Sequence, residues 1–325
     1  MEQFSAASVP GKWAVDMLPF LEHLPDWLPG TGFKRTARLW KQTMTDVAGL
    51  PYDFAKNRIG ESGRTSFVSK SIEQARREDS FGPEDEHAIK WSAASMYAGG
   101  ADTSVSTMAA FFLAMSMFPA VQRKAQEEID RVIGSGRLPK PSDRERLPYV
   151  NAVVEEAQRW HPIAPMGLPH AADEDDAING FRIPKGALLV PAIWWFTRDP
   201  QVYHDPEAFK PERFLPPYSE PLATHVTFGF GRRVCPGRVL ADASLFLTFA
   251  QSLAAFEIRK VLDGSGGVVE PIHTFNSGIV SHPGAFEVQV LPRSVQVADL
   301  VKAVVTEHPW VESDAKYIRK AGGGV

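Results

Sequence analysis

Residues 228–237, FGFGRRVCPG, constrain this chain more than any other segment, because they hold its only cysteine just before a strong helical pattern. The glycines of this segment allow the backbone to turn closely beneath a flat ligand. We expect Cys235 to stand at the start of a helix, with Pro236 at the first helical position. The partial positive charge of that helix N-terminus, together with Arg233, favours a thiolate. The sequence therefore predicts a chemically active Cys235; the alternative is an inert, buried cysteine in a basic loop.

Helical patterns account for most of the remaining chain. We expect helices over residues 34–78, 84–118, 121–133, 148–160 and 236–256. The helix over 121–133 is amphipathic, with Val121, Ala125 and Ile129 on one face. The expected architecture is mainly α with a small β region, as a single domain over residues 1–294 followed by a C-terminal tail over 295–325.

The β region is expected after residue 170. Asn179-Gly180 is typical of a tight turn, and residues 181–190 alternate like strands around a Pro-Lys-Gly sequence. Residues 275–290 are a further hairpin candidate, whereas residues 199–224 carry many prolines and little periodicity. We expect the terminal AGGGV to be disordered.

The composition gives no support for a nucleic-acid partner, since 35 Lys and Arg stand against 39 Asp and Glu. A single cysteine rules out an intrachain disulfide and suits a reducing compartment. The start of the chain lacks the basic and apolar runs of a signal peptide. Residues 103–118 are uncharged but fewer than the ~20 that a membrane-spanning helix needs, so we expect them in a buried helix of a soluble protein.

Residues 10–33 are rich in proline, glycine and tryptophan. Two interpretations stay open for them. The segment is either an irregular connection or, through residues 13–33, a surface that contacts membrane with its Trp and Leu side chains.

Residues 228–237 resemble the haem-binding loop of the cytochrome P450 superfamily. Phe228, Gly231, Arg233, Cys235 and Gly237 match its pattern Phe-x-x-Gly-x-Arg-x-Cys-x-Gly at every fixed position. The resemblance implies a haem b cofactor (iron protoporphyrin IX), with Cys235 as the axial thiolate and Arg233 paired with a haem propionate. It also implies that Phe228 packs beside the porphyrin, and that the glycines let backbone N–H groups approach the sulfur.

Glu156-Ala157-Gln158-Arg159 matches the family's Glu-x-x-Arg motif, and Arg213 follows in Pro-Glu-Arg-Phe at the matching place. Periodicity alone predicts something different. Arg159 falls nearly opposite the apolar face of its helix, which indicates an exposed ion pair with Glu156. The resemblance instead implies a structural triad of Glu156, Arg159 and Arg213 that fixes the segment before the haem loop.

The sequence Ala98-Gly-Gly-Ala-Asp-Thr-Ser104 lies within the long helix expected over residues 84–118. Its two glycines weaken a helix, and a threonine hydroxyl can locally open one. The feature is therefore either a simple helix break or, by resemblance, the family's acid–alcohol pair in the oxygen-binding groove. In the second case Thr103 holds dioxygen and a water, and Asp102 supplies protons.

His170 follows the Glu-x-x-Arg helix at the spacing where fungal members of the family bind a haem propionate. A solvated surface histidine is the alternative. By the same resemblance, residues 163–167 and 276–280 fall where substrate-contacting loops lie.

The resemblance extends from the Pro/Trp-rich segment to about residue 294. We expect the chain to lack the N-terminal third of a full member, including the membrane anchor and a Trp-x-x-x-Arg helix. The implied reaction is insertion of one oxygen atom from O2 into a small apolar molecule, in fungal secondary metabolism or xenobiotic oxidation. The implied partner is NADPH-cytochrome P450 reductase, and the implied location is the cytosolic face of the endoplasmic reticulum membrane.

Two other functions stay open. One is a haem-thiolate isomerase or peroxide-using enzyme, against which Asp102-Thr103 argues because such enzymes need no proton relay. The other is a non-enzymatic remnant that retains no haem.

Overall fold

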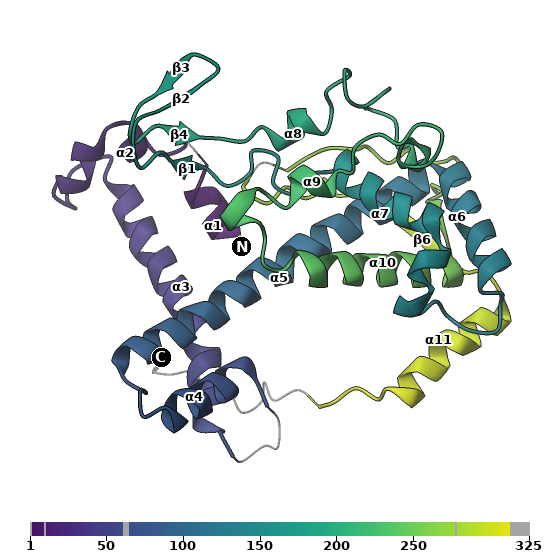
Figure 1. Ribbon diagram of the computed structural model, residues 1–325, viewed down its shortest axis with the longest axis horizontal. Helices are drawn as coiled ribbons and strands as arrows, with labels where there is room; N and C mark the ends of the chain where they lie inside the picture. The colour runs from purple at the N-terminus through teal and green to yellow at the C-terminus, as the bar shows by residue number, and fades with distance from the viewer. Residues whose placement is uncertain (1, 10, 61–64, 277, 313–325) are drawn as a thin grey trace. The chain divides into compact units, whose positions relative to one another are not determined.

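The computed structural model describes residues 2–9, 11–60, 65–276 and 278–312 (Figure 1). These residues form two compact units. The first comprises the described residues up to Ala101 together with 310–312, and the second comprises residues 102–309. The chain passes from the first unit to the second within one helix, α5 (Pro83–Met117).

The first unit is helical. Its elements before α5 are α1 (Glu2–Ala7), α2 (Ala14–Met17), the 3₁₀ helix η1 (Pro19–His23), α3 (Gly32–Asn57) and α4 (Phe67–Arg77). Tyr52, Val68, Ile72 and Ile89 form its apolar core. The helix expected over residues 34–78 is thus two helices, because Ser66 starts α4 with a capping box: its hydroxyl accepts a hydrogen bond from the Ser69 amide at 3.1 Å.

The long helix is continuous across Gly99 and Gly100, so the helix break suggested by the sequence is not present. It ends at Met117, and α6 (Pro119–Val132) begins two residues earlier than predicted because proline suits the first helical position. No single helix among the described residues is long and apolar enough to cross a membrane. Only α5 and α6 taken together meet that test, across a bend of 104°.

Helix packing builds the core of the second unit. The helix α7 (Pro148–Trp160) follows the 3₁₀ helix η2 (Pro141–Arg146), and α10 (Arg238–Ala255) packs against α6 and α7. Phe111 of α5 stacks on Phe249 of α10, with ring centroids 3.9 Å apart. Both phenylalanines are fully buried, as are Ala125, Val150 and Val153. The mainly α architecture expected from the sequence is therefore confirmed.

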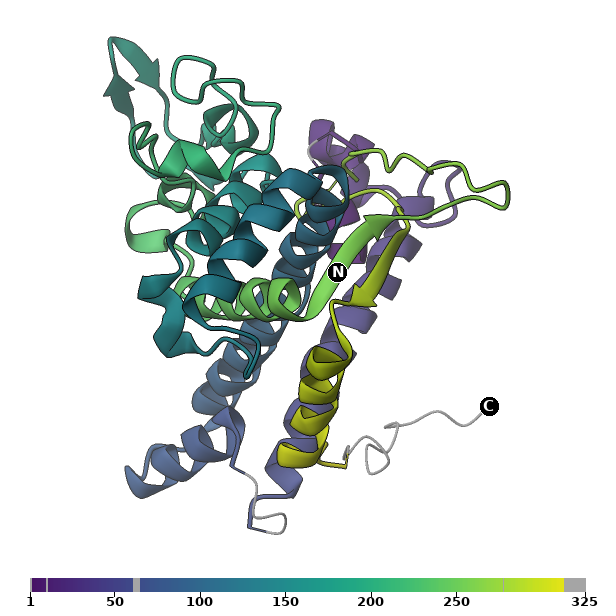
Figure 2. The same cartoon turned by 90° about the vertical axis from the view of Figure 1, so that its right-hand side faces the viewer.

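Within the described residues the strands form three antiparallel pairs, which are β1 (His170–Ala171) with β4 (Leu188–Leu189), β2 (Asp176–Ile178) with β3 (Phe181–Ile183), and β5 (Phe256–Lys260) with β6 (Val288–Pro292). Figure 2 shows β5 and β6 side by side. Asn179 and Gly180 have φ of +50° and +84°, which confirms the predicted tight turn. The hairpin suggested for residues 275–290 is reduced to one bridge between Phe275 and Pro283.

Short elements connect these parts of the second unit, namely α8 (Ile193–Phe196), η3 (Pro211–Phe214), α9 (Thr224–Thr227) and η4 (Gly231–Arg233). The last helix, α11 (Val295–Glu307), begins with a cap in which the Ser294 hydroxyl accepts from the Val297 amide at 3.2 Å. It packs against α10 and β6. The segment expected to be a tail thus starts with a packed helix, and the terminal AGGGV lies outside the described residues.

Candidate functional site

The cysteine loop turns sharply before α10. Gly229 and Gly231 have φ of +79° and +55°, in the left-handed region that favours glycine. The Cys235 amide donates to the Phe228 carbonyl at 2.8 Å, which closes the loop. Gly237 is the N-cap of α10, so the helix begins at Arg238 rather than at Pro236 as predicted. Cys235 lies in the turn just before the helix N-terminus, and its thiol is half-buried.

Two exposed side chains with N–H donors, Arg233 and His170, are available to an anionic group. Arg233 is exposed and has no ion-pair partner among the residues that the structure describes. His170, on β1, is likewise exposed and without a side-chain partner in the described part of the chain. Both side chains are therefore compatible with the propionate contacts that the sequence suggested.

The residues around Cys235 fit a haem. A Cβ built on Gly237 would lie 3.8 Å from the Cys235 sulfur, an ordinary contact, so the thiol packs against this glycine without strain. Phe230, before η4, and Val239 and Leu240, in the first turn of α10, leave 48%, 74% and 74% of their surface exposed. Exposed apolar side chains this close to Cys235 in the sequence are available to be covered by a planar apolar cofactor. Among the described residues no group of three or more His, Cys, Asp or Glu side chains is arranged to hold a metal ion.

Glu156, Arg159 and Arg213 lie together in the interior, exposed by 0%, 0% and 3%. Arg159 Nε and Nη2 donate to the two Glu156 oxygens at 2.7 and 2.9 Å. Arg213 Nε lies 3.1 Å from Glu156 Oε2. Burial raises the pKa of Glu156, and the two guanidinium groups oppose that rise. The exposed pair that periodicity indicated is not present.

The triad ties α7 to the irregular segment 199–224 and to Thr197 just before it. Arg159 Nη1 donates to the Thr197 carbonyl at 2.8 Å, and the Lys210 amide donates to Glu156 Oε1 at 2.6 Å. On the far side Arg213 pairs with Glu220 at 2.7 Å. The segment without periodicity is therefore held by charge-assisted hydrogen bonds rather than by its own secondary structure.

Glu155, which the sequence analysis did not single out, anchors the chain just before the cysteine loop. It accepts from the Thr224 amide at 3.1 Å and from its hydroxyl at 2.9 Å, at the start of α9. Burial raises the pKa of this carboxyl group. In the sequence Glu155 is marked only by its position beside the Glu-x-x-Arg motif. That position does not distinguish a buried anchor from a solvated acid.

Asp102 and Thr103 occupy successive positions on α5 and are both half-buried. The Asp102 carboxylate lies 3.2 Å from Nε2 of His282. One turn later, the buried Ser106 hydroxyl donates to the Ser281 carbonyl at 2.6 Å. The structure thus joins this part of α5 to the loop before β6.

The two loops expected to contact substrate meet at their ends, because the Ser281 amide donates to the Ile163 carbonyl at 2.7 Å. The fully buried His161 stands beside them, with Nε2 3.3 Å from the Ser281 carbonyl and Nδ1 3.3 Å from His273. Burial lowers the pKa of His161 to about 4. The sequence marked His161 only as a helix end, and position 277 lies outside the described residues.

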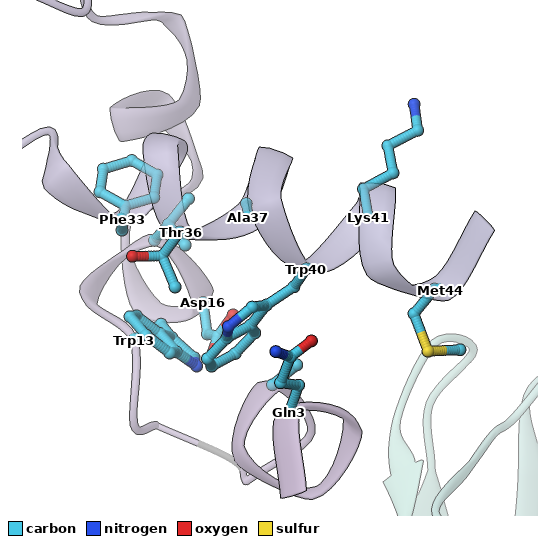
Figure 3. Close-up of a pocket in the computed structure, with 11 residues that line it drawn as sticks. Gln3, Trp13, Asp16, Phe33, Thr36, Ala37, Trp40, Lys41 and Met44 are labelled. Atoms are coloured by element: carbon cyan, nitrogen blue, oxygen red, sulfur yellow. The ribbon is translucent and has the colours of Figure 1, made fainter. Parts of the chain in front are cut away.

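A separate cleft of about 330 Å³ lies in the first unit between α1, α2 and α3 (Figure 3). Trp13 and Trp40 meet edge to face in it, with ring centroids 5.6 Å apart. None of the site residues predicted from the sequence lines this cleft.

Comparison with known proteins places residues 9–290 within the family described as Cytochrome P450. The chain is 45% identical over 97% of its length to cytochrome P450 monooxygenase claR of Ampulloclitocybe clavipes. It is 43% identical over 94% of its length to the multifunctional cytochrome P450 monooxygenase af510 of Aspergillus fumigatus, and 40% identical over 98% to the O-methylsterigmatocystin oxidoreductase of Aspergillus flavus. It spans 58%, 58% and 60% of these relatives, so it matches about three fifths of their length.

Proposed function

The chain belongs to the cytochrome P450 family, and from that premise we propose that it carries the haem-thiolate centre of a monooxygenase. The observation that carries the proposal is the closed loop that holds a half-buried Cys235 thiol before the N-terminus of α10. Cys235 is the iron ligand in this proposal, because it occupies the cysteine position of the family's haem-binding motif and lies just before the start of α10. The free side chains of Arg233 and His170 bind the haem propionates, and Phe228 packs beside the ring.

The bound haem supplies the activation of O2 and the transfer of one oxygen atom. The chain supplies the proton path. Asp102 passes protons to the oxygen-binding side of α5, and the Thr103 hydroxyl holds O2 and a water there. The loops at 163–167 and 276–280 contact a small apolar substrate. The hydrogen bond from Ser281, the residue just after the second loop, to Ile163, the first residue of the first loop, supports this role.

The partners follow from the family. Electrons come from NADPH-cytochrome P450 reductase, and the enzyme works at the cytosolic face of the endoplasmic reticulum membrane. The exposed apolar side chains of residues 13–33 contact that membrane. The names of the relatives, among them an O-methylsterigmatocystin oxidoreductase, support a role in fungal secondary metabolism.

A haem-thiolate isomerase or peroxygenase is the less favoured function, because it has no use for the acid and the hydroxyl that stand side by side at Asp102 and Thr103. A remnant that retains no haem is the third alternative. The satisfied triad of Glu156, Arg159 and Arg213 favours a chain that still folds around its cysteine loop.

The test is the spectrum of the haem-loaded chain. We expect the reduced carbon-monoxide complex to show the thiolate-type Soret band, and Cys235→Ala to lose it. Val234→Ala, a small change at the neighbouring position, should keep it. A band that survives Cys235→Ala contradicts the ligand assignment, and a wild-type chain that takes up no haem supports the remnant.

A further inference from the structure

Asp102 has a partner that its sequence neighbourhood does not indicate. The Nε2 atom of His282 lies 3.2 Å from Oδ2 of Asp102, within ion-pair distance when the imidazole is protonated. The two side chains are 32% and 25% exposed, so water reaches both. The family motif on α5 names Asp102 and Thr103, but His282 belongs to the loop before β6.

The backbone at His282 is fixed by hydrogen bonds that do not involve Asp102. The neighbouring residue Ser281 is 1% exposed. Its carbonyl accepts from the Ser106 hydroxyl at 2.6 Å, and its amide donates to the Ile163 carbonyl at 2.7 Å. The His282 carbonyl in turn accepts from the Asn276 amide at 2.8 Å. The imidazole is therefore presented to α5 from a loop that is already anchored.

Two contacts on one face of α5 join it to this loop. Asp102 and Ser106 are four residues apart on the helix, so their side chains lie one above the other. The Ser106 contact is buried and neutral, and it fixes the loop. The Asp102 contact is partly exposed and ionic. Since the loop is already held by Ser106, the His282 contact restricts mainly the rotamers of the Asp102 side chain.

We propose that His282 is a positioning residue for Asp102. Its imidazole holds the carboxylate in the one orientation from which the carboxylate serves the site beside Thr103. The use of this orientation in catalysis rests on the proposed function. The orientation itself does not depend on haem and can be measured in the haem-free chain. A glutamine at position 282 retains an N–H donor at the end of its side chain, and an alanine has none.

The first measurement follows the Asp102 rotamer in the haem-free chain, through three-bond couplings in nuclear magnetic resonance spectra. The wild type should show one χ1 rotamer for Asp102. His282→Ala should show averaging over several rotamers, and His282→Gln should restore the single rotamer. As the matched control, His308→Ala, an exposed histidine at the end of α11, should leave Asp102 unchanged. A single Asp102 rotamer in His282→Ala overturns the proposal.

The second measurement separates positioning from a purely structural role. We expect hydrogen exchange of the Ser281 amide to stay as slow in His282→Ala as in the wild type, because Ser106 and Ile163 hold Ser281. Fast exchange there, with the Asp102 rotamer unchanged, would mean that His282 only stabilises the loop. Failure of the proposed function appears instead in the Cys235 spectrum, on which neither of these measurements depends.

Discussion

At the scale of single residues, the burial of three charges at Glu156, Arg159 and Arg213 is a large electrostatic demand on the second unit. Buried charges are tolerated only when each is paired and hydrogen-bonded. Here Glu156 accepts from both arginines and from the Lys210 amide. Removing Arg159 leaves the buried Glu156 carboxylate with one guanidinium partner instead of two, which costs more than the loss of a surface pair.

We therefore expect Arg159→Ala to lower the free energy of unfolding by about 3–5 kcal/mol. The matched control is Arg182→Ala, whose side chain is 76% exposed and pairs with Asp175. That change should cost under about 1 kcal/mol. Both values can be measured by denaturant unfolding. A loss at Arg159 no larger than at Arg182 would mean that the triad contributes no more than a surface pair.

The burial of Arg159 was not predictable from helical periodicity, and the reason is physical. The apolar face of α7, with Val150 and Val153, was visible in the sequence and is buried as expected. The opposite face is covered by the segment around Thr197 and Ala208, which accepts hydrogen bonds from Arg159. That segment has no periodicity, so the sequence alone gave no sign of where it packs. The Glu-x-x-Arg motif, through its resemblance to the family, indicated a contact of Arg159 that helical periodicity could not indicate.

At the scale of elements, the C-terminal end of α7 and the loop before β6 meet around a buried histidine. His161 is 0% exposed, and burial lowers its pKa from an ordinary value of 6.5 to about 4. Between these two pH values the unfolded chain binds a proton at this side chain and the folded chain does not. Acidification through this window therefore favours unfolding.

From this shift we expect the wild type to lose roughly 2 kcal/mol of stability through His161 between about pH 7 and about pH 5. Over the same pH interval the free energy of unfolding of His161→Gln should fall by roughly 2 kcal/mol less than that of the wild type. The comparison is made by denaturant unfolding of each variant at both pH values. The control is His308→Gln, an exposed histidine, which should keep the wild-type dependence. The same pH dependence in His161→Gln as in the wild type would show that this side chain is not buried in its neutral form.

Helices were predictable as elements, whereas strand partners were not. The positions of α5, α6, α7 and α10 follow from apolar spacing and from prolines that set helix starts. The strands β1, β2, β3 and β4 are only two or three residues long, too short for a period-2 pattern to identify a partner. The sequence suggested that residues 181–190 form two strands on either side of one turn. In the structure β3 pairs with β2 instead, and β4 pairs with β1.

At the scale of the whole molecule, the division after Ala101 has no counterpart in the sequence, which indicated one domain to residue 294. Domain boundaries are recognised by linkers rich in proline, glycine or polar residues. Here the two glycines at 99 and 100 are the one local signal near the boundary, and the helix α5 continues across them, so no linker separates the units. The sequence did mark one distinctive surface of the first unit, the apolar segment at residues 13–33.

That segment carries side chains suited to a membrane interface. Met17, Phe20 and Trp27 are 72%, 60% and 79% exposed. Burying one such side chain in lipid contributes about 1.5–3 kcal/mol, so Phe20→Ser or Trp27→Ser should weaken binding to phosphatidylcholine vesicles by roughly tenfold or more. Vesicle co-sedimentation measures this directly. Trp310→Ser is the matched control, because Trp310 is 90% exposed but lies outside the segment; its loss should leave binding unchanged. If Trp310→Ser weakens binding as much as Trp27→Ser, the attraction is a general effect of exposed tryptophan, and residues 13–33 form an irregular connection rather than a membrane contact.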